Sequence, residues 1–398
     1  MRNSEDSSPV SYRQCPVCGS GRRSLFFRQS FEHLSGARLL DGYDVVVCSE
    51  CGAGYADKIP HQSVFDEYYR ELSKYDYEFR GGKDCSASEG RFLDVALTIE
   101  PFIPTKHCRI LEIGCGSGHL LRVLQERGFQ NVQGSDPSPA CARAAQGIGV
   151  RVVSKTVFTA TLPEEPYDFL ILTGVMEHIR DLDRTVMQFH RLLRDGGRVY
   201  LEVPDASRLG PSLDAPFQEF SVEHINFFSP GSLSNLMQAR SFRTLTTGRA
   251  RRAQNETVCL SAYGVYEKSA APAPIEPDTE TEAGLRAYIQ GCQTEDAHIR
   301  SKIDKAVFPG ERMIVWGVGT HTLRLLATGG LDPNKIAVFV DSNRKYQRQE
   351  LRGIAVVSPD EVRNRTEPIL ISSRGFQGEI LGQIRESLQL RNKVILLY

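Results

Sequence analysis

The sequence predicts an α/β protein in three parts: an N-terminal module with four clustered cysteines, a central domain with a mostly parallel sheet, and a smaller C-terminal α/β domain. Three observations lead to this prediction. Two cysteine pairs stand near the N-terminus, strand and helix patterns alternate from about residue 86 to 265, and the alternation resumes at residue 313. Strands that alternate with helices form mostly parallel sheets with both faces covered.

Composition narrows the class of protein. The chain has 398 residues, a formal net charge of −1, 40% apolar residues and 24% charged residues. This length suggests two or three domains, and the near-zero charge argues against a nucleic-acid partner. No apolar stretch approaches the roughly 18 residues that cross a bilayer, so we expect no membrane partner either. Residues 1–9 are polar and lack the apolar core of a signal peptide, which favours a cytoplasmic location.

Cysteine spacing predicts the N-terminal module. Its four thiols form two C-x-x-C pairs, Cys15 with Cys18 and Cys48 with Cys51. Four thiolates at such spacing fit tetrahedral Zn²⁺, and they fill every position, so the metal would be structural. Two reduced pairs without metal are an alternative, as is a zinc ribbon that binds nucleic acid. A redox role is disfavoured, because no helix follows either pair.

The central domain is expected to alternate strands with helices. The predicted strands are residues 109–113, 131–135, 150–153, 168–172, 198–203, 243–247 and 257–263. The predicted helices are residues 118–127, a short one after Ser138-Pro139, 183–193, and one that starts at Ser229-Pro230. Ser at an N-cap and Pro at the first helical position are typical helix starts.

A glycine-rich turn follows the first central strand. Residues 112–118 read EIGCGSG, and the next strand ends at Asp136. Glycines let a ligand approach the backbone closely, and a helix start offers free N–H donors. A carboxylate at the end of the next strand can accept both ribose hydroxyls. The pattern E-x-G-x-G-x-G differs from the dinucleotide pattern G-x-G-x-x-G.

These motifs resemble those of class I S-adenosylmethionine (SAM)-dependent methyltransferases, which have a Rossmann-like fold. The resemblance continues through Asp136-Pro137, residues 167–172, Glu177-His178 and residues 192–201. It implies that Gly114, Gly116 and Gly118 line the methionine and ribose of the cofactor. By the same resemblance Glu112 orders the loop, Asp136 holds the ribose, and Pro137 flanks the adenine.

Candidate catalytic residues follow two later strands. Glu223 and His224 lie in an insertion after the fifth strand, at the sheet edge where ligands bind in open α/β folds. Methyl transfer needs a positioned nucleophile that loses a proton, and a histidine suits that task. We therefore expect His224 as general base, tuned by Glu223, with His178 as a second candidate. A structural role at a helix entrance is the alternative. Aromatic residues over 65–79, Tyr75 among them, form either a lid over the sulfonium or core between the zinc module and the sheet.

The C-terminal domain repeats the pattern on a smaller scale. Residues 268–281 resemble a linker, 284–306 a helix, and Gly317 and Gly319 a second glycine turn, with Asp341 ending the next strand. The predicted strands are 313–316, 336–340, 354–357, 369–372 and 393–397, and the predicted helices 320–328 and 378–388. This half-Rossmann-like unit either binds a nucleotide or a phosphate of the acceptor, or only packs.

The whole layout is similar to that of the zinc-containing nucleotide-sugar C-methyltransferases. It implies a zinc module over residues 1–70, a methyltransferase domain over 71–267, a linker over 268–283 and a substrate-binding domain over 284–398. The expected acceptor is a small molecule, a keto-sugar nucleotide or a specialised metabolite. In that family a tyrosine stands three residues before the histidine, where this chain has Ser221. O- or N-methylation, or an NAD-dependent oxidoreductase acting through the C-terminal domain, are the alternatives.

Overall fold

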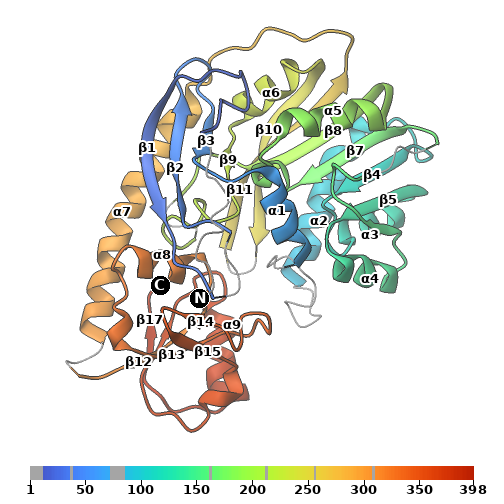
Figure 1. The fold of residues 1–398 in the computed structure, drawn as a ribbon. Coiled ribbons are helices and arrows are strands. Elements are labelled where there is room, and N and C mark those ends of the chain that lie inside the picture. Colours follow the sequence, from blue (N-terminus) through green and yellow to red (C-terminus); the bar gives the residue numbers. More distant parts are fainter. Residues whose placement is uncertain are drawn as a thin grey trace, which may run out of the picture.

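The computed structural model describes residues 12–35, 39–71, 86–160, 164–210, 214–254, 257–306 and 310–398. Tyr75, with the rest of residues 72–85, lies outside them. Figure 1 shows three sheets, one in each predicted part of the chain: a blue N-terminal sheet, a cyan-to-yellow central sheet and a red C-terminal domain below them. The predicted α/β class with three parts is confirmed.

The N-terminal sheet has four antiparallel strands in the order β1-β2-β3-β9. They are β1 (Arg23–Ser30), β2 (Gly42–Cys48), β3 (Gly54–Asp57) and β9 (Asn226–Phe227). Helix α1 (Gln62–Glu71) follows β3. Strand β9 comes from the central part of the chain, two residues after His224, and it pairs with β3 through Gly54 and Tyr55. The N-terminal sheet, which carries the four cysteines and is called the cysteine module below, is therefore hydrogen-bonded to the segment that carries Glu223 and His224.

The central sheet has seven strands in the order β10-β11-β8-β7-β4-β5-β6. The strands are β4 (Arg109–Ile113), β5 (Asn131–Asp136), β6 (Val152–Ser154), β7 (Tyr167–Thr173), β8 (Leu193–Pro204), β10 (Phe242–Gln254) and β11 (Thr257–Lys268). The helices are α2 (Ser86–Ile99), α3 (His119–Glu126), α4 (Pro139–Gly147), α5 (Leu182–Leu192) and α6 (Pro230–Gln238). Strands β4 to β8 pair in parallel, and β11 and β10 add an antiparallel pair at the edge.

The C-terminal sheet has six strands in the order β14-β15-β13-β12-β16-β17. They are β12 (Met313–Trp316), β13 (Ile336–Val340), β14 (Glu350–Leu351), β15 (Ile354–Val357), β16 (Ile369–Ile371) and β17 (Val394–Leu396). Helices α8 (Thr320–Ala327) and α9 (Gln377–Gly382) accompany them. All pairs are parallel except β14 with β15.

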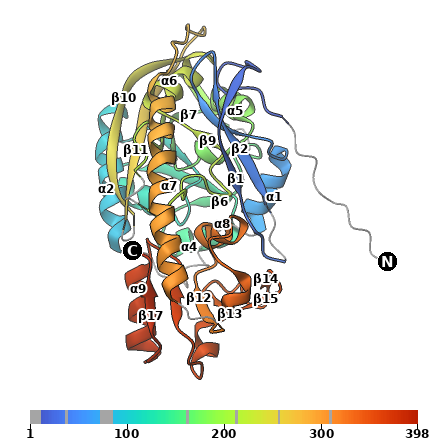
Figure 2. The same ribbon diagram turned by 90° about the vertical axis from the view of Figure 1, so that its left-hand side faces the viewer.

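Helix α7 (Glu280–Ala306) joins the parts of the molecule. Figure 2 shows it running from the N-terminal sheet down to the C-terminal domain. Leu285, Tyr288 and Cys292 pack in the core beneath the N-terminal sheet, whereas Ile299 and Ile303 pack in the C-terminal core. One helix thus contributes to two hydrophobic cores, and the division of the chain at residues 283 and 284 stays a prediction.

Two local differences separate the structure from the predicted elements. Strands β10 and β11 are about twice as long as expected, because β10 continues through the polar run that includes Arg249 and Arg252, which form ion pairs with Asp205 and Glu202. Strand β8 begins at Leu193, directly after α5, so it includes residues 194–197, which separate the predicted helix from the predicted strand. In the described ranges no helix is both long and apolar enough to cross a membrane.

Candidate functional site

The glycine turn between β4 and α3 has the backbone that its sequence predicts. Gly114, Gly116 and Gly118 all have positive φ, at 73°, 53° and 81°. A Cβ on Gly114 would stand 2.5 Å from Cγ2 of Val175, whereas a Cβ on Gly116 would meet no atom within 4 Å. Gly114 is therefore required for packing, and Gly116 leaves open space beside the loop.

Asp136 fixes this turn from the end of β5. Its Oδ2 accepts a hydrogen bond from the backbone N–H of Gly116 at 2.9 Å, and its Oδ1 accepts one from Ser138 at 2.9 Å. The nearby Glu112 is buried, and its Oε2 has no hydrogen-bond partner in the described chain. Burial, with a smaller effect from Asp136, raises the pKa of Glu112 well above its usual value. Asp136 thus contacts the loop directly, whereas the role of Glu112 in ordering the loop stays a prediction.

A cavity of about 410 Å³ opens at the carboxyl ends of β4, β5, β7 and β8. Such a volume lies in the range of small-molecule sites. The residues predicted for cofactor binding that line it are Glu112, Gly114, Gly116, Asp136 and Pro137. Gly118 instead faces Ala145 and Val150. His178 and His224 line the same cavity, which joins the glycine turn to both candidate histidines in one space.

The two histidines lie edge to face, with ring centroids 4.9 Å apart. His178 follows β7 in a short 3-10 helix (Met176–His178), and its Nδ1 donates to the backbone carbonyl of Glu223 at 2.9 Å. Nδ1 of His224 lies 3.3 Å from the carboxylate of Glu219. Glu177 is buried beside them, and burial raises its pKa to about 7.

The side chain of Glu223 points elsewhere. It is fully buried, and its Oε1 accepts a hydrogen bond from the hydroxyl of Tyr68 at 2.8 Å. It lines a separate, smaller cavity near α8 rather than the large one. The carboxylate that contacts His224 is that of Glu219, which the sequence reasoning missed. Glu219 stands five residues before His224 in the sequence. The turn between them brings the two side chains together, and no sequence motif predicts that turn.

Three side chains of the N-terminal module and β9 hold the two histidine loops together. Arg13 is buried and donates to the carbonyls of Ile225 and Arg180 and to the side chain of Asn226. Asn226 in turn donates to the carbonyls of Met176 and Ile179. The hydroxyl of Tyr43 donates to the carbonyls of Ser221 and His224, at 2.9 and 3.3 Å. The geometry of the histidines therefore depends on the cysteine module.

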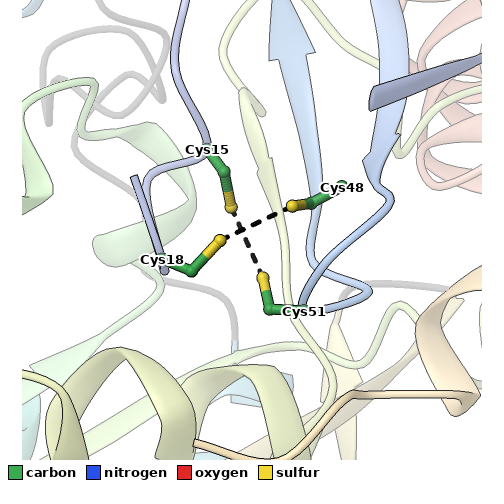
Figure 3. A group of neighbouring side chains, drawn as sticks. All are labelled: Cys15, Cys18, Cys48 and Cys51. Carbon is green, nitrogen blue, oxygen red and sulfur yellow. Dashed lines mark hydrogen bonds between the residues drawn. The ribbon is translucent and has the colours of Figure 1, made fainter. Parts of the chain in front are cut away.

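The four cysteines converge as predicted (Figure 3). The Sγ atoms of Cys15 and Cys51 are 3.5 Å apart, and those of Cys18 and Cys48 are 3.6 Å apart. A disulfide needs about 2.05 Å, whereas Zn–S bonds of about 2.3 Å in a tetrahedron place sulfurs about 3.8 Å apart. Three of the cysteines are buried and one is partly buried. The donor set fits a structural zinc ion.

The second glycine turn, at Gly317 and Gly319, has a backbone and an aspartate contact similar to those of the first. Gly317 has a φ of 103°, and Asp341 accepts hydrogen bonds from the N–H groups of Val318 and Asn343, each at 2.8 Å. The cavity beside it, which Gly319 and Thr320 line, measures only about 60 Å³. This volume holds a few water molecules and no nucleotide.

Comparison with known proteins agrees with this geometry. Residues 72–247 match the family described as "Methyltransferase domain", and residues 310–396 match the family described as "C2185-like, N-terminal". The first match contains the glycine turn, Asp136 and both histidines.

Similar proteins carry methyltransferase names. An uncharacterized methyltransferase of Geobacillus thermodenitrificans is 30% identical over 34% of this chain and 60% of its own length. The ubiquinone biosynthesis O-methyltransferase of Sinorhizobium medicae is 34% identical over 25% of this chain and 42% of its own. The chain thus spans less than two thirds of these relatives. The structure of the 1,6-didemethyltoxoflavin-N1-methyltransferase of Burkholderia thailandensis covers 56% of this chain and 96% of its own, with 17% identity and a TM-score of 0.42.

Proposed function

We propose that this chain, whose central part is a class I SAM-dependent methyltransferase domain, transfers a methyl group from SAM to a small-molecule acceptor. The observation that carries the proposal is the shared cavity, in which an open glycine turn and Asp136 face the same space as His178 and His224. SAM would lie along Gly114 and Gly116, with its ribose at Asp136 and its adenine beside Pro137. The acceptor would then lie between the methyl group and the histidines.

The reaction places few demands on the protein. A lone pair of the acceptor forms a bond to the methyl carbon while the carbon–sulfur bond breaks, and the sulfur keeps that electron pair as S-adenosylhomocysteine. The chain must align the two reactants and accept the proton of the nucleophile. His224, with Glu219 at its Nδ1, is our candidate for that proton acceptor, and His178 packs against it.

For the acceptor, we infer a nucleotide sugar, with C-methylation beside a keto group. The order of the three parts of the chain supports this, and so do the cavity cations Arg91 and Arg208, which could bind a diphosphate. Ser221 replaces the expected tyrosine, and its hydroxyl accepts hydrogen bonds from the N–H groups of Glu223 and His224 instead. O- or N-methylation of a specialised metabolite is the second candidate, because a hydroxyl or amine needs no tyrosine.

Calorimetry on the full chain tests the cofactor. We expect SAM and S-adenosylhomocysteine to bind with about 1:1 stoichiometry and NAD to give no heat, since the cavity at Gly319 is too small for a nucleotide. Binding of NAD alone would replace the proposal by an oxidoreductase. Mass spectrometry of small molecules released from the purified chain, followed by transfer assays on sugar nucleotides and phenols, identifies the acceptor class.

His224→Ala is expected to lower turnover by roughly 10²–10⁴-fold, the usual contribution of a positioned proton acceptor. Affinity for SAM should change little, because His224 is not among the residues that we expect to bind SAM. Turnover is measured as release of S-adenosylhomocysteine, and affinity by calorimetry. The exposed His298 on α7 supplies the control variant His298→Ala. Full turnover in His224→Ala would move the proton acceptor to another residue.

Glu219→Gln and Glu223→Gln form a matched pair. We expect Glu219→Gln to lower turnover by about 10-fold or more with the fold intact, because its carboxylate contacts His224. Glu223→Gln is expected to act mainly on thermal stability, through its buried hydrogen bond with Tyr68. Thermal unfolding and turnover are measured on both. If Glu223→Gln loses turnover without losing stability, the role in tuning His224 belongs to Glu223.

A further inference from the structure

A second cluster of metal-binding side chains lies in the large cavity, apart from the four cysteines. Glu177, His178 and His224 each bring one ligand atom to within 4.8 Å of the others. All three line the cavity. Two imidazoles and a carboxylate are donors that suit divalent first-row ions.

The imidazole of His178 is oriented as metal ligands usually are. A carbonyl oxygen only accepts, so Nδ1 of His178 carries the proton that it donates to Glu223. Nδ1 of His224 lies 3.3 Å from Oε2 of Glu219, but that oxygen accepts no hydrogen bond from the described residues. In a neutral imidazole, a proton on Nδ1 puts the lone pair on Nε2. Metal-bound histidines are held in this way, by a carbonyl or carboxylate at the other ring nitrogen.

Glu177 gives an independent reason to expect a cation. The residue is 3% exposed, and its Oε2 has no hydrogen-bond partner among the described residues. Its Oε1 lies 3.9 Å from Nε2 of His178, too far for a hydrogen bond. A buried carboxylate oxygen without a hydrogen-bond partner is costly unless the carboxyl group is protonated or meets a positive charge. A cation between Glu177 and the imidazoles would supply that charge.

Acidic side chains outnumber basic ones around the cavity, although Glu202 is paired with Arg252 and the pKa of Glu112 is raised. The described lining of the cavity includes seven carboxylates against three lysine and arginine side chains. The carboxylates are Asp66, Glu112, Asp136, Glu177, Glu202, Asp214 and Glu219, and the cations are Arg91, Lys155 and Arg208. Metal–ligand bonds of about 2.0–2.2 Å in a tetrahedron place two donors about 3.3–3.6 Å apart. Oε1 of Glu177 and Nε2 of His178 are 3.9 Å apart, and the ligand atoms of all three residues lie within 4.8 Å of one another, so they would move closer together to hold one ion.

We propose that Glu177, His178 and His224 bind one divalent cation of the Mn²⁺, Co²⁺ or Zn²⁺ type, with open coordination positions toward the cavity. A bound ion lowers the pKa of a coordinated hydroxyl. The acceptor class that fits carries a nucleophilic oxygen beside a second oxygen, so that both bind the ion. The hydroxyl proton leaves to a cavity water, the oxygen forms the bond to the methyl carbon, and sulfur keeps the electron pair. This role for the ion rests on the second candidate of the proposed methyl transfer, O-methylation, in which His224 binds the ion and is not the proton acceptor.

Titration of the zinc-loaded full chain with Mn²⁺, followed by electron paramagnetic resonance, tests the site. Mn²⁺ prefers nitrogen and oxygen donors, so the thiolate cluster does not compete for it. We expect one Mn²⁺ per chain. His178→Ala and Glu177→Gln should each weaken binding by roughly 100-fold, and Glu219→Gln, which acts through His224, by about 10–100-fold. His298→Ala is the matched control and should bind Mn²⁺ as the parent chain does.

The proposal is overturned if neither Mn²⁺ nor Co²⁺ binds below about 1 mM, or if Glu177→Gln and His178→Ala bind Mn²⁺ as tightly as the parent chain. SAM calorimetry on each variant shows whether the fold survives. It also separates the two proposals: a chain that binds Mn²⁺ but not SAM refutes methyl transfer alone, and a chain that binds SAM but neither metal refutes the ion site alone.

Discussion

Asp136→Asn is expected to lower the affinity for SAM by roughly 100-fold or more, which corresponds to about 3 kcal/mol. In the structure both carboxylate oxygens accept hydrogen bonds from backbone N–H groups, those of Gly116 and Ser138. The NH₂ group of an asparagine faces one of these N–H donors and cannot accept its hydrogen bond. The glycine turn therefore loses one of the two hydrogen bonds that hold it. The substitution also removes the charge that we expect the ribose hydroxyls to contact. Calorimetry with SAM measures the loss, and circular dichroism checks the fold.

Asp341→Asn is the matched control. Asp341 accepts two backbone hydrogen bonds beside the C-terminal glycine turn, in the same arrangement as Asp136. If SAM binds the central domain, this variant keeps the affinity of the parent chain. The opposite result, with SAM affinity lost in Asp341→Asn and kept in Asp136→Asn, would place the adenosine site in the C-terminal domain.

Replacing Cys48 and Cys51 by serine is expected to remove the one equivalent of zinc that the four cysteines hold. Structural zinc in small modules supplies about 10–16 kcal/mol of apparent binding free energy, so we expect the N-terminal module to unfold without it. Methyl transfer should fall by roughly 100-fold or more, since Arg13, Tyr43 and the pairing of β3 with β9 hold the segment that carries His224. Metal analysis, hydrogen exchange over residues 42–57 and 221–227, and turnover are the measurements.

The affinity for SAM separates this result from general misfolding. The glycine turn and Asp136 belong to the central sheet, so the double variant should still bind SAM. Cys108→Ser, which alters a buried cysteine outside the cluster, is the control and should keep both zinc and turnover. Full turnover in a zinc-free double variant would contradict the coupling between the cysteine module and His224.

Local sequence patterns predicted most of the secondary structure. The strands at residues 109–113, 313–316 and 336–340 have the predicted bounds, because each is a buried apolar run that ends at a turn or a polar residue. Ser229 and Pro230 begin α6 with a capping box, as N-cap chemistry predicts. The two-residue strand β9 was not predicted, since its pairing with β3 depends on chain far away in sequence. The extra length of β10 was missed because its polar residues Arg249 and Arg252 are stabilised in the sheet by ion pairs with Asp205 and Glu202.

The residues of the candidate site also fall into two groups, those that local motifs predict and those that only the fold brings together. The glycine turn, Asp136, both histidines and the four cysteines could be found from the sequence, because each belongs to a motif with fixed local spacing. The partner of His224 could not. Glu223 is its neighbour in the chain, yet its buried side chain contacts Tyr68, whereas Glu219 reaches the imidazole.

The sequence alone determined the α/β class, the order of the three parts, the glycine turn and the cysteine cluster, since all of these depend on residue periodicity and short spacings. Only the tertiary structure decided that β9 completes the N-terminal sheet, that α7 serves two cores, and that Glu177, His178 and His224 share one cavity with the glycine turn. Such juxtapositions arise from packing between segments more than two hundred residues apart, as when Arg13 contacts Ile225. No local sequence pattern predicts contacts between residues so far apart in the chain.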